Sequence, residues 1–580
     1  MISAARPQPS PIASSAKRRV VVIGGYGVFG GRLVRRLLDD GRFDVVVAGR
    51  SRTKAETFAA RVGGTPAELD VTAGSFANRL TALAPWCVVD AAGPFQLTKD
   101  SGYPVARAAL ACKAHYIDLS DDPTFTVQIA DLNQAAKAAD CVVISGASTV
   151  PAISSAALDE LTRDLRDVRL VRSFITPGNR APRGLSVIRA ILAQAGQKRR
   201  YWRDGAKAAD IAWGKVVRRD VGLLNGPTLG TRWASPIGAP DLELFADRYR
   251  ARSVDFNAGL ELSIMHWGLW ALTFPVRWGW LKSLNFIARP VRFAATLLYP
   301  FGSDRGGMRV DAYGVTADSE ARHYRWDLVA EDGDGPEIPA IPAFVAVSKL
   351  ADGDYAPGAR PAVGTMSLAE FTDACKPFAI QSDTQVSGYA RVFPTIIGRS
   401  FETLPQPVRA LHDVIGTRVW VGSARSERGT SLIARTVAWF IGLPPSADET
   451  PVTVVMQREG RSETWTRTFG KATFRSTLTP SDEPGFVVER FGALHFTLHL
   501  RPDGDRLYYD VKGARAFGVV PLPRWLTPVS ETHEFVHQTG EPGFSVRVTL
   551  PVGGLLFAYE GRLRPWAAEA GCTQHAIAAK

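Results

Sequence analysis

The segment that most constrains the fold is a short apolar run followed by a glycine-rich turn, over residues 20–37. The β-branched residues at 20–23 predict a buried strand, and apolar side chains at every fourth position from 29 to 37 predict a helix. In that turn the pattern G-x-G-x-x-G allows tight bending, close approach to a pyrophosphate and packing of the helix on the strand. A glycine turn without a ligand is the alternative, and the flanking strand and helix favour a dinucleotide site. The residues of the pattern are Gly25, Tyr26, Gly27, Val28, Phe29 and Gly30.

The second predicted strand, at 43–48, ends at the position where NAD and NADP sites differ. About twenty positions after the glycines, NAD sites usually carry an acidic residue for the ribose 2′-hydroxyl. This chain has Arg50 there, followed by Ser51 and Arg52. Cations and a hydroxyl suit a 2′-phosphate, so the sequence predicts NADP(H), unless Arg50 only caps the strand and faces solvent. The third predicted strand ends near Asp70, which we expect on the adenine side.

Strands and helices alternate up to about residue 165. Buried strands are predicted at 86–92, 115–119 and 141–146, with a helix at 105–112 between the first two. This alternation predicts an α/β fold for residues 18–165, a doubly wound parallel Rossmann sheet whose ligand lies over the C-terminal strand ends.

Four short motifs in this region resemble one known family. They are the glycine turn and the segments 90–95 (Asp-Ala-Ala-Gly-Pro-Phe), 115–119 and 146–152. Over about residues 18–160 the chain resembles the NADP-binding domain of saccharopine dehydrogenase-like oxidoreductases. The resemblance implies that the glycine turn and Arg50 hold the cofactor. It also implies that four further residues lie along the cofactor's path to the nicotinamide, namely Ala92, Gly93, Pro94 and Phe95. Saccharopine is not implied as the substrate.

Composition is that of a globular protein with two or three domains, at 580 residues, 46% hydrophobic and 22% charged. The net charge of +12 is spread without a long basic block, so we expect no nucleic acid partner. Five cysteines without a Cys-x-x-Cys pair predict buried thiols in a reducing, cytoplasmic compartment. We expect tails at 1–17 and 566–580, the first disordered and without the apolar core of a secretory signal.

Residues 166–380 are predicted to form a second domain of α+β type, for substrate binding or dimerisation. It contains an aromatic stretch, 264–292, that is uncharged up to residue 276 and then carries tryptophans among Arg277, Lys282, Arg289 and Arg292. The uncharged run is shorter than the roughly twenty residues that span a bilayer. Three interpretations stay open: a core helix or homodimer contact, a helix lying on a membrane surface, or the wall of a pocket for a lipid-like substrate.

Beyond a predicted linker at 381–400, residues 401–565 show a different pattern. One helix at 432–441 and many short strands predict a mainly antiparallel β domain. The region resembles an uncharacterised domain family that recurs behind saccharopine dehydrogenase-like NADP domains, and this resemblance implies no chemistry. Two strands could offer histidines to a metal, but no carboxylate or cysteine completes the set, so we predict no metal site. These histidines are His495, His499, His533 and His537.

The sequence therefore predicts an NADP(H)-dependent oxidoreductase of the saccharopine dehydrogenase-like type, acting on an unidentified small molecule. A non-catalytic NADP(H)-binding scaffold or sensor, attached peripherally to a membrane, is the alternative. Each candidate proton donor near a strand end has a structural explanation as a cap or a solvent-facing charge, so no catalytic residue is assigned. The candidates are Lys99, Tyr103, His115, Tyr116 and Asp118.

Overall fold

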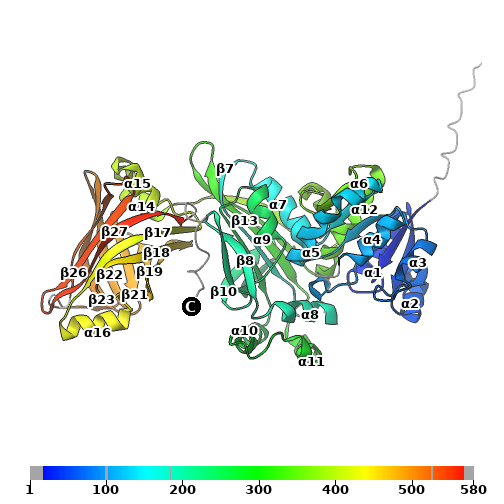
Figure 1. The fold of residues 1–580 in the computed structure, drawn as a ribbon, viewed down its shortest axis with the longest axis horizontal. Helices are drawn as coiled ribbons and strands as arrows, with labels where there is room; N and C mark the ends of the chain where they lie inside the picture. The colour runs from blue at the N-terminus through cyan, green and yellow to red at the C-terminus, as the bar shows by residue number, and fades with distance from the viewer. Residues whose placement is uncertain (1–16, 98–101, 183, 524, 526, 567–580) are drawn as a thin grey trace, which may run out of the picture.

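The computed structural model describes residues 17–97, 102–182, 184–523, 525 and 527–566. Within these residues the chain forms three β-sheets. Figure 1 shows a parallel sheet at one end of the long axis, a mixed sheet in the middle and a β-barrel at the other end. The predicted fold classes are confirmed for all three regions.

The first sheet is parallel throughout, with strand order β15-β6-β5-β4-β1-β2-β3. The order reverses at β1, between β4 and β2, and ligands of such sheets bind at the C-terminal strand ends beside the reversal. The strands are β1 (Arg18–Ile23), β2 (Phe43–Gly49), β3 (Thr65–Glu68), β4 (Cys87–Asp90), β5 (His115–Asp118), β6 (Val142–Ser145) and β15 (Gly358–Pro361).

Helices cover both faces of this sheet. Alternate residues of each strand point to opposite faces, so each strand contributes side chains to two cores. Val20 and Val22 of β1 share a core with Leu37 of α1. Val21 shares a second core with Phe76 of α3. The helices are α1 (Gly30–Asp40), α2 (Arg52–Val62), α3 (Phe76–Ala82), α4 (Pro104–Ala111), α5 (Pro123–Gln128), α6 (Asn133–Ala138) and α7 (Ser154–Leu161).

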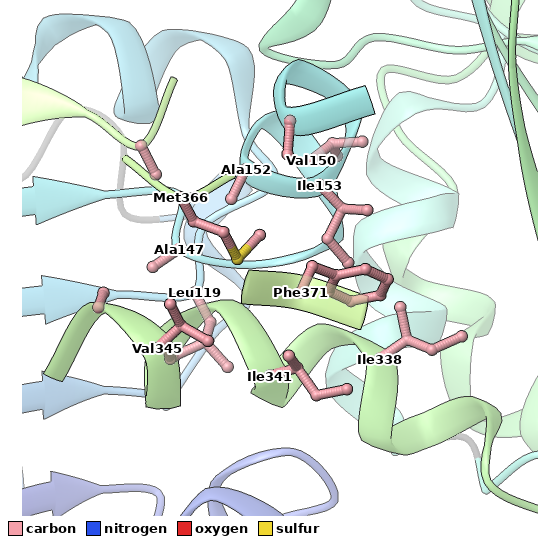
Figure 2. Close-up of a cluster of buried hydrophobic side chains, with 14 of the residues drawn as sticks. Leu119, Ala147, Val150, Ala152, Ile153, Ile338, Ile341, Val345, Met366 and Phe371 are labelled. Carbon is pink, nitrogen blue, oxygen red and sulfur yellow. The ribbon is translucent and has the colours of Figure 1, made fainter. Parts of the chain in front are cut away.

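The chain returns to the first sheet after building the middle one. Residues 358–361, within the stretch assigned to the second domain, form β15 and pair with β6. Two helices flank β15, namely α12 (Ile341–Asp352) and α13 (Leu368–Cys375). Figure 2 shows Phe371 of α13 beside Ile153, which precedes α7; Ile341 of α12 and Val150 belong to the same buried cluster. The first sheet is thus completed by residues that lie well beyond 165.

The middle sheet is mixed, with order β10-β11-β12-β7-β13-β14-β16, and β8 pairs with β12 and β9. Its strands are β7 (Leu165–Thr176), β8 (Lys198–Arg203), β9 (Ala206–Ile211), β10 (Val217–Gly222), β11 (Thr228–Pro236), β12 (Ser253–Gly259), β13 (Gly306–Thr316), β14 (Ala321–Ala330) and β16 (Ile380–Gly388). Its helices are α8 (Leu185–Gln194), α9 (Asp241–Arg248), α10 (Ser263–Arg277) and α11 (Ala288–Leu297).

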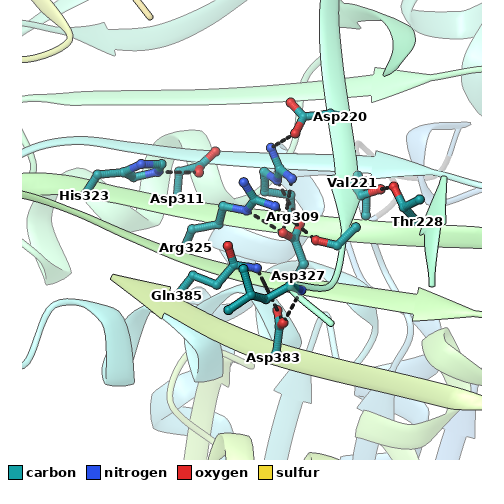
Figure 3. A network of polar contacts seen from close by, with 12 residues as sticks. Asp220, Val221, Thr228, Arg309, Asp311, His323, Arg325, Asp327, Asp383 and Gln385 are labelled. Carbon is teal, nitrogen blue, oxygen red and sulfur yellow. Dashed lines mark hydrogen bonds and ion pairs between the residues drawn. The ribbon is translucent and has the colours of Figure 1, made fainter. Parts of the chain in front are cut away.

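An ion-pair network with a buried centre crosses this sheet (Figure 3). Arg309 on β13 donates to both carboxylate oxygens of Asp327 on β14, at 2.7 and 3.1 Å. Arg309 also pairs with Asp220 on β10 at 3.0 Å, and Arg325 supplies a second cation to Asp327. Because the Asp327 side chain is fully buried, its charge depends on these two guanidinium groups.

Residues 381–400, predicted as a linker, contain two regular elements. Most of β16 lies in this stretch, and the whole strand forms the edge of the middle sheet, where it pairs with β14. After it come α14 (Val392–Ile397) and α15 (Gln406–Leu411), which lead into the barrel.

The C-terminal region is a closed antiparallel barrel, and α16 (Leu432–Ile441) lies at one end of it (Figure 1). Ten strands form the ring, which closes where β22 pairs with both β21 and β23, and β24 extends from β23. The strands are β17 (Thr417–Arg428), β18 (Ala447–Glu459), β19 (Ser462–Phe469), β20 (Ala472–Pro480), β21 (Phe486–Phe491), β22 (Leu494–Asp503), β23 (Arg506–Ala516), β24 (Val520–Pro521), β25 (Val529–Val536), β26 (Pro542–Leu550) and β27 (Gly554–Pro565).

Candidate functional site

The glycine turn lies between β1 and α1. Gly24 has a φ of +77°, in the left-handed region that favours glycine, and a Cβ there would lie 2.8 Å from the carbonyl oxygen of Ala91. A Cβ on Gly30 would overlap the carbonyl group of Gly24. The amide groups of Val28, Phe29 and Gly30 make no hydrogen bond within the part of the chain that the structure describes. Three donors at the start of α1, next to the positive end of its dipole, form a site that suits phosphate.

The other glycines of the predicted motif are also closed to side chains. A Cβ on Gly25 would lie 2.8 Å from the carbonyl oxygen of Val22, and one on Gly27 would lie 3.0 Å from that of Gly24. The left-handed residue is Gly24, one position before the motif, which sequence reasoning did not single out. The doubled glycine at 24–25 was the available signal.

Tyr26 leaves the turn and packs against the end of β2. A Cβ on Gly49 would lie 2.6 Å from the Tyr26 ring, so this contact requires glycine. The Tyr26 hydroxyl accepts a hydrogen bond from the Ser51 amide at 3.1 Å. The Ser51 hydroxyl in turn accepts from the Lys54 amide at 3.4 Å and caps α2. Tyr26 and Ser51 therefore make structural contacts beside the predicted 2′-phosphate position.

Arg50 is the more available of the two arginines predicted for the 2′-phosphate. It is exposed and makes no hydrogen bond or ion pair within the described ranges. Arg52 instead forms an ion pair with Glu56 at 2.7 Å. Asp70 accepts from the amide and hydroxyl of Thr72 at 3.0 and 2.8 Å; these bonds, with a smaller contribution from Arg50, lower its pKa. The cofactor roles of these residues stay predictions.

The loop after β4 lies directly beside the glycine turn, because Ile23 of β1 pairs in register with Asp90 of β4. The Asp90 carboxylate accepts a hydrogen bond from the Ala92 amide at 2.9 Å, and burial raises the pKa of Asp90 to about 7. Gly93 and Pro94 then lead into a short 3-10 helix, Phe95–Leu97. The structure thus brings together the glycine turn and the loop at 92–95, two of the segments that the sequence assigned to the cofactor.

A cleft of about 590 Å³, here called the central cleft, opens beside this loop and runs to α8, α10 and α11. Its first end is formed by residues of the turn and loop, and its far end is mostly apolar. Representative wall residues are Phe29, Pro94 and Phe95 at the first end and Ile188, Ile191, Leu269, Leu272, Ala295 and Leu298 at the far end. This geometry joins the predicted nicotinamide region to an apolar chamber.

One polar pair stands at the first end of the central cleft. Gln96 donates from its side-chain amide to Asp121 at 2.7 Å, and both residues line the cleft. Asp121 is exposed in the open cleft, and its surroundings still raise the pKa of its carboxyl, a rise that the hydrogen bond from Gln96 opposes. Sequence reasoning missed the pair, although Asp121 follows directly after a predicted strand, at the edge where ligands of parallel sheets bind.

The candidate proton donors from the sequence have structural roles where the structure describes them. Asp118 is fully buried and accepts hydrogen bonds from the Ser120 amide, the Ser145 hydroxyl and the Gly146 amide, each at 2.9 Å. His115 accepts from the Val142 amide at 3.0 Å, and Tyr103 donates to the Phe125 carbonyl at 2.8 Å. Tyr116 is buried, and Lys99 lies outside the described residues.

Helices α10 and α11 form the outer wall of the central cleft. Together with the segments that follow them, up to residue 301, they carry an exposed apolar surface, here called the helical platform. Leu269 and Thr273 face inward, so the core-helix interpretation holds for the inner side only. Residues 262–303 carry four cations and no carboxylate. In the described ranges, no helix has the length and apolar character needed to cross a membrane. Exposed on the platform are Ile264, Trp267, Leu272, Trp278, Trp280, Phe286, Phe293, Leu297, Tyr299 and Phe301.

Among the residues that the structure describes, no three His, Cys, Asp or Glu side chains are grouped so that they could hold a metal ion.

Two segments of the chain match known families. Residues 20–144 match the saccharopine dehydrogenase NADP binding domain, and residues 404–563 match a domain of unknown function (DUF4166). The chain therefore carries a saccharopine dehydrogenase-type NADP-binding domain followed by this uncharacterised domain, as the resemblance predicted. The first match supports an NAD(P)-dependent oxidoreductase. No curated protein matches the chain.

Several solved structures resemble part of the chain. Apo saccharopine dehydrogenase (L-Glu forming) from Saccharomyces cerevisiae is 15% identical, with a TM-score of 0.45 over 63% of this chain and 100% of that one. A probable dehydrogenase from Thermotoga maritima is 11% identical, with a TM-score of 0.31 over 61% and 93%. Biliverdin reductase from Synechocystis sp. PCC 6803, in complex with biliverdin and NADP+, is 12% identical, with a TM-score of 0.29 over 62% and 96%. Likeness at this level carries no conclusion about function.

Proposed function

We propose that this chain is an NADP(H)-dependent oxidoreductase that acts on an apolar substrate in the central cleft. The observation that carries the proposal is the continuity of the cleft. It runs from the loop beside the free amides of the glycine turn into a chamber whose wall is mostly apolar. A ligand pocket of this size and character suits a small, mostly apolar molecule.

The residues that would hold the cofactor fit a dinucleotide. The amides of Val28, Phe29 and Gly30 would bind the pyrophosphate, and Arg50 would bind the 2′-phosphate. When bound, NADP(H) supplies or accepts the hydride. Phe29, Pro94 and Phe95 would exclude water from the reacting carbon. Asp121, oriented by Gln96, is the group best placed to hold a proton at its carboxyl oxygen.

The cofactor assignment is tested with Arg50→Asp. Wild-type protein should bind NADPH more tightly than NADH. The substitution removes a charge-assisted contact to the 2′-phosphate and adds a repelling charge, so NADPH affinity should fall at least about tenfold while NADH affinity stays similar. Arg52→Ala is the matched control, because Arg52 is paired with Glu56. Fluorescence titration with both nucleotides measures the effect, and an unchanged preference in Arg50→Asp would remove the assignment.

Turnover is tested separately from binding. NADPH absorbance is followed with medium-chain enals, ketones and imines as substrates. Steady consumption that Asp121→Asn slows at unchanged NADPH affinity supports the enzyme. Binding of NADPH without consumption of any of these substrates would favour the non-catalytic scaffold.

We further propose that the helical platform rests on an anionic membrane surface, from which an apolar substrate reaches the cleft. Exposed tryptophans among cations favour the headgroup region of a bilayer. Residues on the platform helices also line the cleft, among them Ile264 and Leu272, so the two surfaces are continuous.

The membrane proposal is tested by flotation with phosphatidylcholine vesicles, with and without phosphatidylserine. Wild-type protein should float with the anionic vesicles, and Trp278→Ser with Trp280→Ser should abolish this. Trp439→Ser is the matched control, since Trp439 is a similarly exposed tryptophan on the distant α16. Equal flotation of the double variant and wild type, or flotation of neither, would contradict the proposal.

A further inference from the structure

The barrel encloses a second cavity, of about 330 Å³, that is separate from the central cleft. Inward-facing residues of its strands line this cavity, as on β26, where Phe544, Val546, Val548 and Leu550 alternate with outward residues. Ten-stranded closed barrels are wide enough to leave interior space for a ligand. The volume is about twice that of an engineered apolar cavity of about 150 Å³ that binds benzene.

The two ends of this cavity differ in polarity. At the end covered by α16, Ile433, Val437 and Ile441 recur at four-residue intervals and line the cavity, and Ile433 is also 42% exposed. Leu432 and Trp439 on the outer side of α16 are 83% and 81% exposed. Figure 1 shows α16 at one end of the barrel and α14 and α15 at the opposite end. The α16 end therefore presents an apolar rim to solvent.

Polar groups gather deeper in the cavity. Tyr509 donates to Glu534 at 2.9 Å, and Glu534 also contacts the fully buried His412, which follows α15. Arg467 pairs with Glu489 at 3.4 Å. Arg467 and Glu489 compensate each other, and Glu534 is already hydrogen-bonded to Tyr509 and His412. An ionic head group would therefore lose its hydration and find no partner free of other contacts.

Tyr559 offers the cavity a hydrogen-bond donor that the protein leaves unused. Tyr559 on β27 lines the cavity, and its hydroxyl makes no hydrogen bond within the described part of the chain. Burial raises the pKa of Tyr559 to about 12, so the hydroxyl keeps its proton at neutral pH. A neutral ligand oxygen could accept this proton in a hydrogen bond and satisfy the donor.

From these features we infer that the barrel binds an uncharged aliphatic molecule of about twelve carbons with one oxygen acceptor. The chain occupies the apolar cavity, the oxygen accepts from Tyr559, and the ligand enters past α16. This site is independent of the nicotinamide site and does not rest on the proposed function.

The test uses the full chain with 1-dodecanol, lauric acid and dodecylamine, measured by native mass spectrometry and thermal shift. Dodecanol should bind and raise the melting temperature more than either charged probe. Val546→Trp fills the cavity and should remove one equivalent of bound dodecanol. Arg547→Trp, which adds the same ring on the outer side of the same strand, should leave binding intact. Val546→Trp does not alter the central cleft, so dodecanol bound there is retained in both variants. The difference in bound dodecanol between Val546→Trp and Arg547→Trp therefore measures binding in the barrel.

Tyr559→Phe keeps the ring and removes the hydroxyl, and it should weaken dodecanol binding by about threefold to tenfold. It should not change binding of dodecane, which has no acceptor. Equal dodecanol binding by Val546→Trp and wild type would overturn the inference. Tighter binding of lauric acid than of dodecanol would overturn the assignment of a neutral head group.

Discussion

Replacing Gly30 with alanine should damage both the stability and the cofactor affinity of the N-terminal domain. The new Cβ would overlap the carbonyl oxygen of Gly24, and it would lie 2.9 Å from the Gly24 carbonyl carbon and 3.2 Å from the Cβ of Ala91. Two of these three atoms belong to the backbone of the glycine turn, so no side-chain rotation relieves the overlap. The turn must instead move away from α1.

Forced overpacking of this kind costs about 1–3 kcal/mol. In a domain of about 150 residues that cost lowers the melting temperature by about 2–12 °C. Displacement of the turn also misaligns the amides of Val28 and Phe29, so NADPH affinity should fall by about tenfold or more, equivalent to about 1.4 kcal/mol.

Differential scanning calorimetry and NADPH fluorescence titration measure the two effects on the same preparation. Gly74→Ala is the matched control, because Gly74 lies on the same domain and a Cβ there meets nothing within 4 Å. The packing argument is refuted if Gly30→Ala unfolds at the wild-type temperature and binds NADPH as wild type does.

Two further predictions concern buried charges. Arg309→Met leaves the buried Asp327 with one cation in place of two, so it should lower the free energy of unfolding by about 3–5 kcal/mol in calorimetry. Arg322→Met, in an exposed pair, should cost less than about 1 kcal/mol, and equal losses in the two variants would show that the network adds nothing. Burial raises the pKa of Asp241 from 3.8 to about 7, so between those values the native state binds more protons than the unfolded chain, and this carboxyl makes stability fall as pH rises. Asp241→Asn should therefore flatten the pH dependence of stability and stabilise the protein at about pH 7.5, because its amide oxygen can still accept from Ser173. Urea unfolding at about pH 5 and about pH 7.5 measures this, and an unchanged pH dependence in the variant would contradict the prediction.

The sequence by itself determined the parts of this protein that depend on local pattern. The β-branched run at 20–23, the glycines at 25, 27 and 30 and the periodic helix after them sufficed for a Rossmann unit, because strand, turn and helix lie next to each other in the chain. Alternating short strands likewise sufficed for an antiparallel C-terminal domain.

Tertiary structure alone decided which residues meet across the chain. It brings β15, from residues 358–361, beside β6, and in the barrel it pairs β17 with β27. It also pairs Gln96 with Asp121 and joins α10 and α11 to the cofactor loop through one cleft. Such contacts arise from packing between distant segments, and no local periodicity records which side chains the folded chain will place together.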